Sequence, residues 1–324
     1  MDVIRGSAVL LIIGFHATTI SDTYGDLPAP QWLTDANTVI TPLRIPLLVL
    51  LSGMLLDSSL RKGSRRYFAG KGRNVAWPYL VWTLIWGAAS WPVYSVVGYL
   101  LGGSYLWFLL FLLSFYGAAW LLRALPPAAV VLLAVTASAA ASFLTLGAST
   151  YGERWPYLFA VFMLGHLLTV RPAVRTWTYT SPWAYFLLAV LLTVHFGLSL
   201  GYDYGLESSL FMLTGAILAI RLALRIGSAR VLRPVRFVGR NSLVFYVSHY
   251  PLMVAVVIAV SATTGITGSH TLLLVLGLTA AAVTAGTAAV LINDRLPATR
   301  WLFTVPTRGP TPVQSRHPGG WSTT

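Results

Sequence analysis

Apolar stretches long enough to cross a bilayer recur along most of this chain. A transmembrane helix needs about 20 consecutive, mainly apolar residues. Ten such stretches lie near residues 3–23, 38–58, 75–99, 103–124, 126–145, 154–170, 181–200, 206–224, 237–260 and 271–293. Because a backbone in lipid must satisfy its own hydrogen bonds, stretches of this length predict helices. We therefore expect an all-α, polytopic membrane protein with about ten transmembrane helices.

The composition agrees with a bilayer environment. Of the 324 residues, 56% are hydrophobic and 10% are charged, and the mean hydropathy is +0.72, whereas roughly a quarter of the residues in a soluble globular domain are charged. The net charge of +13 does not indicate a nucleic-acid partner, because the basic residues fall in short stretches between apolar spans. The absence of cysteine excludes disulfides, thiolate chemistry and metal sites built from cysteine.

The distribution of charge predicts the orientation. If both termini are cytoplasmic, 20 of the 22 Lys and Arg residues lie on the cytoplasmic side, as the positive-inside rule requires. The opposite side then carries six carboxylates: Asp22, Asp26, Asp35, Glu153, Asp203 and Glu207. The first apolar stretch has the basic start of a signal peptide, but His16 interrupts it and no clean cleavage site follows, so we expect a retained helix.

The chain is expected to form one membrane domain followed by a short tail. Residues 1–294 contain all ten apolar stretches, and residues 295–324 turn polar. The final segment reads VPTRGPTPVQSRHPGGWSTT, which has no apolar period and cannot bury enough surface to fold alone. We expect residues 295–324 to be a disordered cytoplasmic tail.

The first helix carries two ionisable residues on one face. Arg5 and His16 are about three helical turns apart and leave the helix in the same direction, separated by about 16 Å along its axis. This spacing puts Arg5 at the cytoplasmic interface and His16 near the midplane. An ionisable residue at that depth tends to face the bundle interior and to mark a substrate or proton path. A histidine that only bonds a neighbouring helix is the alternative.

A second helix repeats this arrangement. The segment FVGRNSLVFYVSHYPLM, residues 237–253, has Arg240 at its cytoplasmic mouth. Ser242, Tyr246 and His249 follow on a single helical stripe. Two midplane histidines with basic residues at both openings suggest a shared polar cavity. For Ser242 and Tyr246, ordinary packing between helices remains an equal alternative.

The ordered set of motifs resembles a known family. The spacing of Arg5 and His16 is similar to the signature of the acyltransferase-3 family of integral-membrane acyltransferases. Within this family, the chain resembles the sugar O-acetyltransferase branch, which is related to fucose acetylases. Five further segments resemble family motifs: RIPLLVLLSGML at 44–55, GRNVAWPYLVW at 72–82, YLWFLLFLL at 105–113, FAVFMLGHLL at 159–168 and GRNSLVFYVSHYPL at 239–252. Lys71 with Arg73 departs from the pattern, being a reduced form of the family's basic pair.

The resemblance implies an activity. It predicts transfer of an acyl group, expected to be acetyl, from cytoplasmic acyl-CoA to a hydroxyl of a sugar, glycan or glycosylated metabolite, in a bacterial cytoplasmic membrane. A hydroxyl is a poor nucleophile that needs a base, and histidine is suited to that task near neutral pH. We expect His16 to be this base, with an acyl-histidine intermediate as another route. The role of His249 stays open between orienting the acceptor, polarising the thioester and sharing the proton.

Four basic residues are candidates for binding the phosphates of the acyl-CoA donor through charge-assisted contacts. They are Arg5, Lys71, Arg73 and Arg240. The alternative is that such residues only orient the protein in the bilayer.

Arg44 lies on the outer half of its span, against the orientation bias, and needs a partner. The partner is expected to be a carboxylate, of which Asp22 is the nearest by topology, backbone carbonyls freed by Pro46, or an acceptor substrate. A structural pair and an acceptor site fit equally. Several aromatic residues are expected in interfacial belts or a ligand wall: Trp77, Tyr79, Trp82, Trp107 and Trp155.

Other functions are weighed against acyl transfer. A proton-coupled transporter or flippase would also carry midplane histidines, although the chain lacks a convincing internal symmetry. Another class of membrane-bound O-acyltransferase fits the first helix poorly, and a structural subunit would leave both histidines dispensable. The histidines lack the close spacing of a helical metal pair, so no metal is expected. Consumption of acyl-CoA distinguishes these functions.

Overall fold

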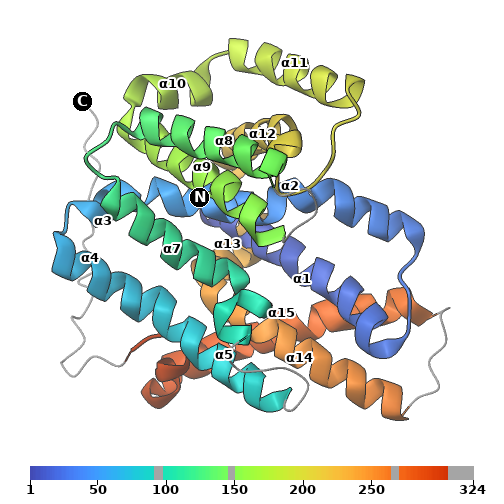
Figure 1. Ribbon diagram of the computed structural model, residues 1–324. Helices are drawn as coiled ribbons and strands as arrows, with labels where there is room; N and C mark the ends of the chain where they lie inside the picture. Colours follow the sequence, from blue (N-terminus) through green and yellow to red (C-terminus); the bar gives the residue numbers. More distant parts are fainter. Residues whose placement is uncertain (91–97, 145–149, 264–269, 306–324) are drawn as a thin grey trace.

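The computed structural model describes residues 1–90, 98–144, 150–263 and 270–305, and these residues contain helices and no strand. The predicted all-α fold is therefore confirmed for this part of the chain. The helices are α1 (Asp2–Gly25), α2 (Gln31–Met54), α3 (Leu56–Leu60), α4 (Ser64–Lys71), α5 (Trp77–Ala89), α7 (Trp107–Leu121), α8 (Pro127–Leu144), α9 (Thr150–Val170), α10 (Pro172–Thr180), α11 (Trp183–Gly197), α12 (Ser209–Ile226), α13 (Arg233–Arg240), α14 (Ser242–Thr263) and α15 (Thr271–Arg295) (Figure 1).

Six helices in the described segments are long and apolar enough to cross a membrane: α1, α2, α8, α12, α14 and α15. They become seven if α9 and α10, which are bent by 97°, form one span. The expected ten spans are not confirmed. The stretches at 75–99 and 103–124 contain shorter helices, α5 with 13 residues and α7 with 15 residues. π-Helical turns lie at the edges of these stretches, at Gly72–Ala76 and at Tyr99–Gly103, where Gly102 has a φ of 104°. Residues 91–97 lie outside the described part of the chain.

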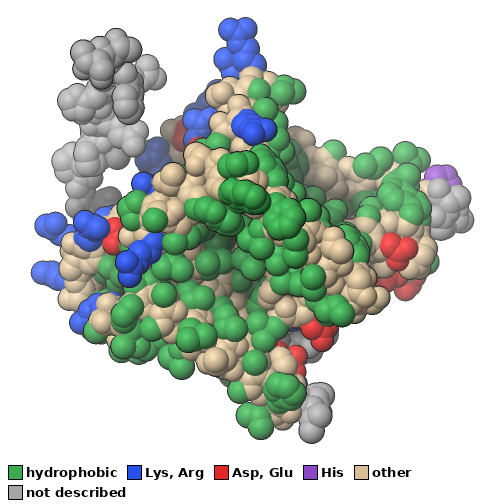
Figure 2. Space-filling model, turned by 90° about the horizontal axis from the view of Figure 1, so that it is seen from above, with side chains coloured by type: hydrophobic (Ala, Val, Ile, Leu, Met, Phe, Trp, Pro, Cys, Tyr) green, Lys and Arg blue, Asp and Glu red, His purple; other side chains and the backbone are tan. Residues whose placement is uncertain are grey.

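The surface of the molecule suits a bilayer. Phe143, Trp183 and Leu273 are 81%, 71% and 68% exposed, a pattern that water penalises and lipid does not. In Figure 2, most Lys and Arg side chains lie on the left and at the top, and most Asp and Glu side chains lie on the right and at the bottom. Multiple apolar helices with charges separated in this way identify an integral membrane protein.

Helix α1 lies at the centre of the bundle and contacts α2, α12, α13, α14 and α15 (Figure 1). It ends at Asp26, whose φ of 51° is left-handed and turns the chain back into α2. The N–H of Leu27 donates to the carbonyl of Ser21 across this turn at 3.1 Å. This turn places the polar ends of α1 and α2 beside each other.

Glycines let neighbouring helices touch backbone to backbone. A Cβ atom at Gly6 of α1 would overlap the carbonyl oxygen of Val235 in α13, and one at Gly239 would overlap the carbonyl oxygen of Asp2. Gly53 of α2 meets the carbonyl oxygen of Phe162 in α9 in the same way, so the Ser-Gly segment of α2 serves close packing.

The start of the expected tail is ordered. A 3-10 helix at Pro297–Leu302 packs against α5, where the indole N–H of Trp82 donates to the carbonyl of Leu302 at 2.9 Å. The indole N–H of Trp77 donates to the carbonyl of Trp301 at 2.6 Å. The segment that follows residue 295 is therefore not disordered at its start, because α5 supplies hydrogen-bond donors for the carbonyls of Trp301 and Leu302. Residues 306–324 lie outside the described part of the chain.

We expect Trp82→Phe to loosen this C-terminal segment. The substitution keeps an aromatic ring beside Phe303, whose ring centroid is 5.7 Å from that of Trp82, but removes a hydrogen bond worth about 1 kcal/mol. Limited trypsin digestion should then cleave faster after Arg300. Trp32→Phe, at a side chain that is 60% exposed, is the control. Equal cleavage rates in the two variants would contradict the expectation.

Candidate functional site

The two histidines that the sequence predicts near the midplane meet. The ring centroids of His16 in α1 and His249 in α14 are 5.2 Å apart. His16 comes ten positions after Gly6, and His249 comes ten positions after Gly239, so the contact of the two glycines sets the histidines at one level. The structure therefore brings the pair together as expected, and the catalytic roles of both residues stay predictions.

An aromatic cluster, formed by Trp86, Tyr105 and Tyr250, packs against one side of the histidine pair. Tyr250 meets the His16 ring edge-on at 5.1 Å and stacks on Tyr105 at 4.8 Å. Trp86 of α5 meets Tyr250 edge-on at 5.3 Å. Sequence reasoning missed this cluster, although Tyr250 directly follows His249.

The His249 ring is 1% exposed and has one nitrogen anchored. Its Nδ1 lies 3.1 Å from the carbonyl oxygen of Phe245. A carbonyl only accepts, so we assign the proton of the neutral ring to Nδ1, which leaves a lone pair on Nε2. Nε2 is buried and has no hydrogen-bond partner among the described residues. A buried acceptor thus lies beside His16.

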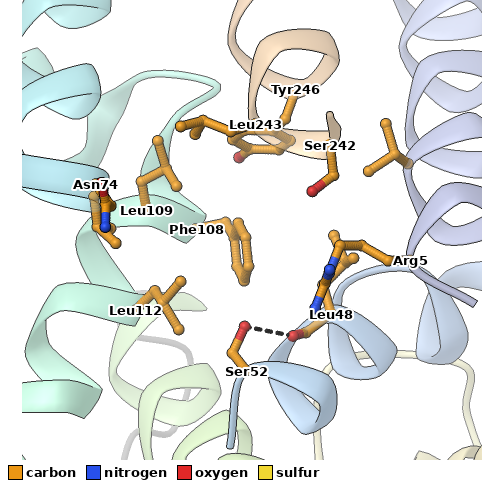
Figure 3. Close-up of a pocket in the computed structure, with 12 residues that line it drawn as sticks. Arg5, Leu48, Ser52, Asn74, Phe108, Leu109, Leu112, Ser242, Leu243 and Tyr246 are labelled. Carbon is orange, nitrogen blue, oxygen red and sulfur yellow. Dashed lines mark hydrogen bonds between the residues drawn. The ribbon is translucent and has the colours of Figure 1, made fainter. Parts of the chain in front are cut away.

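An inner cavity of about 170 Å³ lies on the N-terminal side of the histidines (Figure 3). Arg5, Ser242 and Tyr246 line it together, whereas His16 and His249 do not line it. The Tyr246 hydroxyl, however, donates to the carbonyl of Tyr105 at 2.9 Å. The Tyr105 hydroxyl in turn donates to the carbonyl of Val247 at 2.6 Å. The hydroxyl of Tyr246 therefore serves helix packing, and its ring forms the cavity wall.

A second, basic cavity of about 220 Å³ adjoins the inner cavity, since Asn74 and Val75 line both. Lys62, Arg66 and Lys71 line the basic cavity. The Nζ of Lys71 donates to the Ser59 hydroxyl at 3.2 Å and lies 3.6 Å from the centroid of the Tyr116 ring. Burial, with a smaller effect of Lys62, lowers the pKa of Lys71 to about 8.

The two other basic candidates for donor binding lie outside these cavities. Arg73 is two residues past Lys71, which turns its side chain to the other side of the helix, where it is exposed. Arg240 is exposed at the break between α13 and α14, and its Nε donates to the carbonyl of Arg236 at 3.4 Å. The structure does not support donor-site roles for Arg73 and Arg240.

Arg44 is 3% exposed and uses partners on its own helix. It donates to the Thr41 hydroxyl at 2.6 Å and to the Asn37 side-chain oxygen at 3.4 Å. Its guanidinium lies 4.0 Å from the centroid of the Phe15 ring. The ion pairs in the described residues do not include Arg44, so a pairing with Asp22 is wrong. The threonine and asparagine lie about one and two turns before Arg44 and accept two of its N–H groups.

The predicted aromatic residues mostly serve packing. The Trp107 ring lies 6.0 Å from that of Tyr204 and lines neither the inner cavity nor the cavity between α1 and α2. The Trp155 indole donates to the Ser114 hydroxyl at 2.7 Å, and the Tyr79 hydroxyl donates to the carbonyl of Leu100 at 2.9 Å.

An outer cavity of about 340 Å³ lies between α1 and α2, on the far side of the histidines from Arg5. Its lining includes Phe15, which directly precedes His16, and Asp22, the one lining residue that sequence reasoning proposed. Thr18 and Thr41 were missed. Polar residues at helical spacing inside apolar spans were the signal that could have found them.

The fold and this site define an integral membrane protein with a histidine pair that lies, along α1, between an inner and an outer cavity and lines neither of them. A family model described as an acyltransferase domain, Acyl_transf_3, matches residues 1–291. The chain therefore belongs to the acyltransferase-3 family of membrane acyltransferases. Comparison with curated proteins and with solved structures gives no match. In the described residues, no three His, Asp or Glu side chains are placed to hold a metal ion.

Proposed function

We propose that this protein transfers an acyl group, expected to be acetyl, from acyl-CoA to a hydroxyl of a sugar, glycan or glycosylated metabolite. The observation that carries the proposal is the contact of His16 and His249, at 5.2 Å between ring centroids, between two cavities. Membership of the acyltransferase-3 family supplies the reaction class.

His16 is the proposed general base. It takes the proton from the acceptor hydroxyl as the oxygen attacks the thioester carbonyl, and a tetrahedral intermediate forms. This intermediate collapses with cleavage of the C–S bond. The leaving sulfur takes the proton from the imidazolium, so that an ester and the CoA thiol are released and His16 is neutral again.

The geometry of His249 favours a role beside this base. With Nδ1 donating to Phe245, the neutral ring has no proton on Nε2 and cannot polarise a thioester carbonyl by donation. Its Nε2 lone pair can instead accept from the acceptor hydroxyl or from protonated His16. Orientation of the acceptor and sharing of the proton therefore fit best.

The basic cavity and Arg5 are proposed to hold the phosphates of the donor. They lie at the N-terminal end of α1, on the side that the charge distribution assigns to the cytoplasm. From there the pantetheine arm would enter the inner cavity toward the histidines. This arrangement supports cytoplasmic acyl-CoA as the donor.

We expect Lys71→Ala to raise the KM for acetyl-CoA roughly tenfold, because a charge-assisted contact to phosphate is lost. In the wild type, KM should also rise between about pH 7 and pH 9, since the ammonium loses its proton above its pKa of about 8. Lys71→Arg should flatten this pH dependence, because a guanidinium stays charged. Steady-state kinetics at several pH values measures both effects.

The control for this prediction is Arg73→Ala, which changes a neighbouring charge outside the cavities. Its KM should match that of the wild type. An unchanged KM in Lys71→Ala would remove the basic cavity from the donor site.

Thiol release from acetyl-CoA tests the function itself. Purified protein in nanodiscs is mixed with acetyl-CoA and extracts of the native host as the source of acceptor. We expect release that depends on the extract and on His16. If folded protein consumes no acyl-CoA with any donor or extract, acyl transfer is wrong and a transporter or flippase becomes the better explanation.

A further inference from the structure

The outer cavity is bordered by two facing polar stripes. On α1 the stripe consists of Thr18 and Asp22, and on α2 it consists of Thr34, Thr38 and Thr41. Both stripes lie toward the ends of α1 and α2 that the Asp26 turn joins. Helix packing in lipid does not require such a concentration of polar groups around an open volume of about 340 Å³.

The threonines present hydrogen-bond acceptors to this volume. The hydroxyls of Thr18, Thr38 and Thr41 each donate to the carbonyl four residues earlier, at 3.0 Å. Since each hydroxyl has one proton and two lone pairs, oxygen lone pairs remain available. The exposed carboxylate of Asp22 adds further acceptors at the rim.

Most side-chain donors nearby are bonded within the protein, and Gln31, which also lines the cavity, donates to the Asp35 carboxylate at 2.8 Å. Asn37 donates its side-chain N–H to the Thr18 hydroxyl at 3.2 Å, and Arg44 donates to Asn37 and Thr41. Arg44 is also covered by the Phe15 ring and is 3% exposed. The buried arginine thus braces the two stripes and is shielded from a ligand in the cavity.

We propose that the outer cavity binds the acyl acceptor and selects a neutral polyhydroxyl compound over an acidic one, an inference that rests on the proposed function. Sugar hydroxyls donate to the threonine oxygens and to Asp22, and the Phe15 ring forms an apolar wall. A carboxylate or phosphate on the ligand would face the lone pairs of the same oxygens and the charge of Asp22. The Phe15 ring, which lines the cavity, lies 5.1 Å from the His16 ring, so a ligand here is separated from the base by that ring.

The natural absence of cysteine makes the test direct, since Thr38→Cys introduces the sole thiol of the full chain. The rate of its alkylation by a polar maleimide is measured in nanodiscs. Neutral methyl glycosides of glucose, galactose, fucose and rhamnose and the acidic methyl glucuronide are added in turn. At about ten times its Kd, a bound glycoside should slow alkylation roughly tenfold.

We expect protection by at least one neutral glycoside and none by the glucuronide. Asp22→Asn in the Thr38→Cys background should weaken the protection. Thr34→Cys, on the same stripe, repeats the test in case the first substitution disturbs binding. Ser58→Cys, exposed on α3 away from the cavity, should be alkylated at the same rate with every glycoside.

Alkylation that no neutral glycoside slows at either position, or that the glucuronide slows equally, would overturn the proposal. Thiol release is measured separately on the wild type. Protection of the cysteine from alkylation without consumption of acyl-CoA would support the glycoside-binding site and contradict acyl transfer. Consumption of acyl-CoA without protection of the cysteine would support acyl transfer and contradict glycoside binding in the outer cavity.

Discussion

His16→Ala is expected to lower the rate of acyl transfer by about two to four orders of magnitude, because positioned general-base catalysis contributes that much. The variant should still fold, since the His16 ring makes aromatic contacts but no hydrogen bond to a described residue. Thiol release from acetyl-CoA in nanodiscs measures the loss. In the wild type, activity should also fall as the pH is lowered, because a protonated imidazole cannot accept the hydroxyl proton.

The matched control is His166→Ala, which removes another buried histidine in α9, away from the pair. Its rate should stay close to that of the wild type. Intact-protein mass spectrometry after mixing with acetyl-CoA alone distinguishes the two chemical routes, because an acyl-histidine adds the acyl mass and general-base catalysis does not. Activity of His16→Ala equal to that of the control would exclude His16 as the base.

Gly6→Ala is expected to lower the free energy of unfolding by about 1–3 kcal/mol, the usual cost of overpacking. The added Cβ would overlap the carbonyl oxygen of Val235, and a backbone atom cannot move away as a flexible side chain does. Separating α1 from α13 should also shift His16 relative to His249, so kcat should fall with stability. Thermal unfolding in detergent and thiol release measure the two effects.

Gly14→Ala is the control in the same helix. No atom lies within 4 Å of a Cβ at that position, so alanine should be neutral or slightly stabilising through its helix propensity. The difference between the two variants isolates the close helix contact from the general effect of replacing glycine. Equal unfolding temperatures would contradict the packing argument.

Helical periodicity predicted part of the site correctly. It placed Arg5 and His16 on one face of α1, and Ser242, Tyr246 and His249 on one stripe of α14, and the structure joins these faces at the inner cavity and at the histidine pair. This succeeded because a regular helix fixes the direction of each side chain from its residue number alone.

The predictions failed where the helix is interrupted and at Arg44, whose partners lie on its own helix rather than on the neighbouring one. Arg73 points away from the basic cavity beyond Lys71, and Arg240 sits at the break between α13 and α14. Arg44 binds Asn37 and Thr41 instead of Asp22. The sequence indicates that a buried arginine needs a partner. Which of several nearby partners it binds depends on distances between side chains, and the sequence does not contain these distances.

The sequence by itself determined that this chain is a helical membrane protein, which residues of each helix share a face, and that two histidines lie at similar depths. Bilayer thickness and helix geometry are enough for these conclusions. The tertiary structure alone decided that the histidines touch, that Lys71 rather than Arg73 enters the basic cavity, and that threonines of α1 and α2 enclose the outer cavity. These features depend on which helices pack together and at what level, and that is set by close contacts such as Gly6 with Gly239 between segments far apart in the chain.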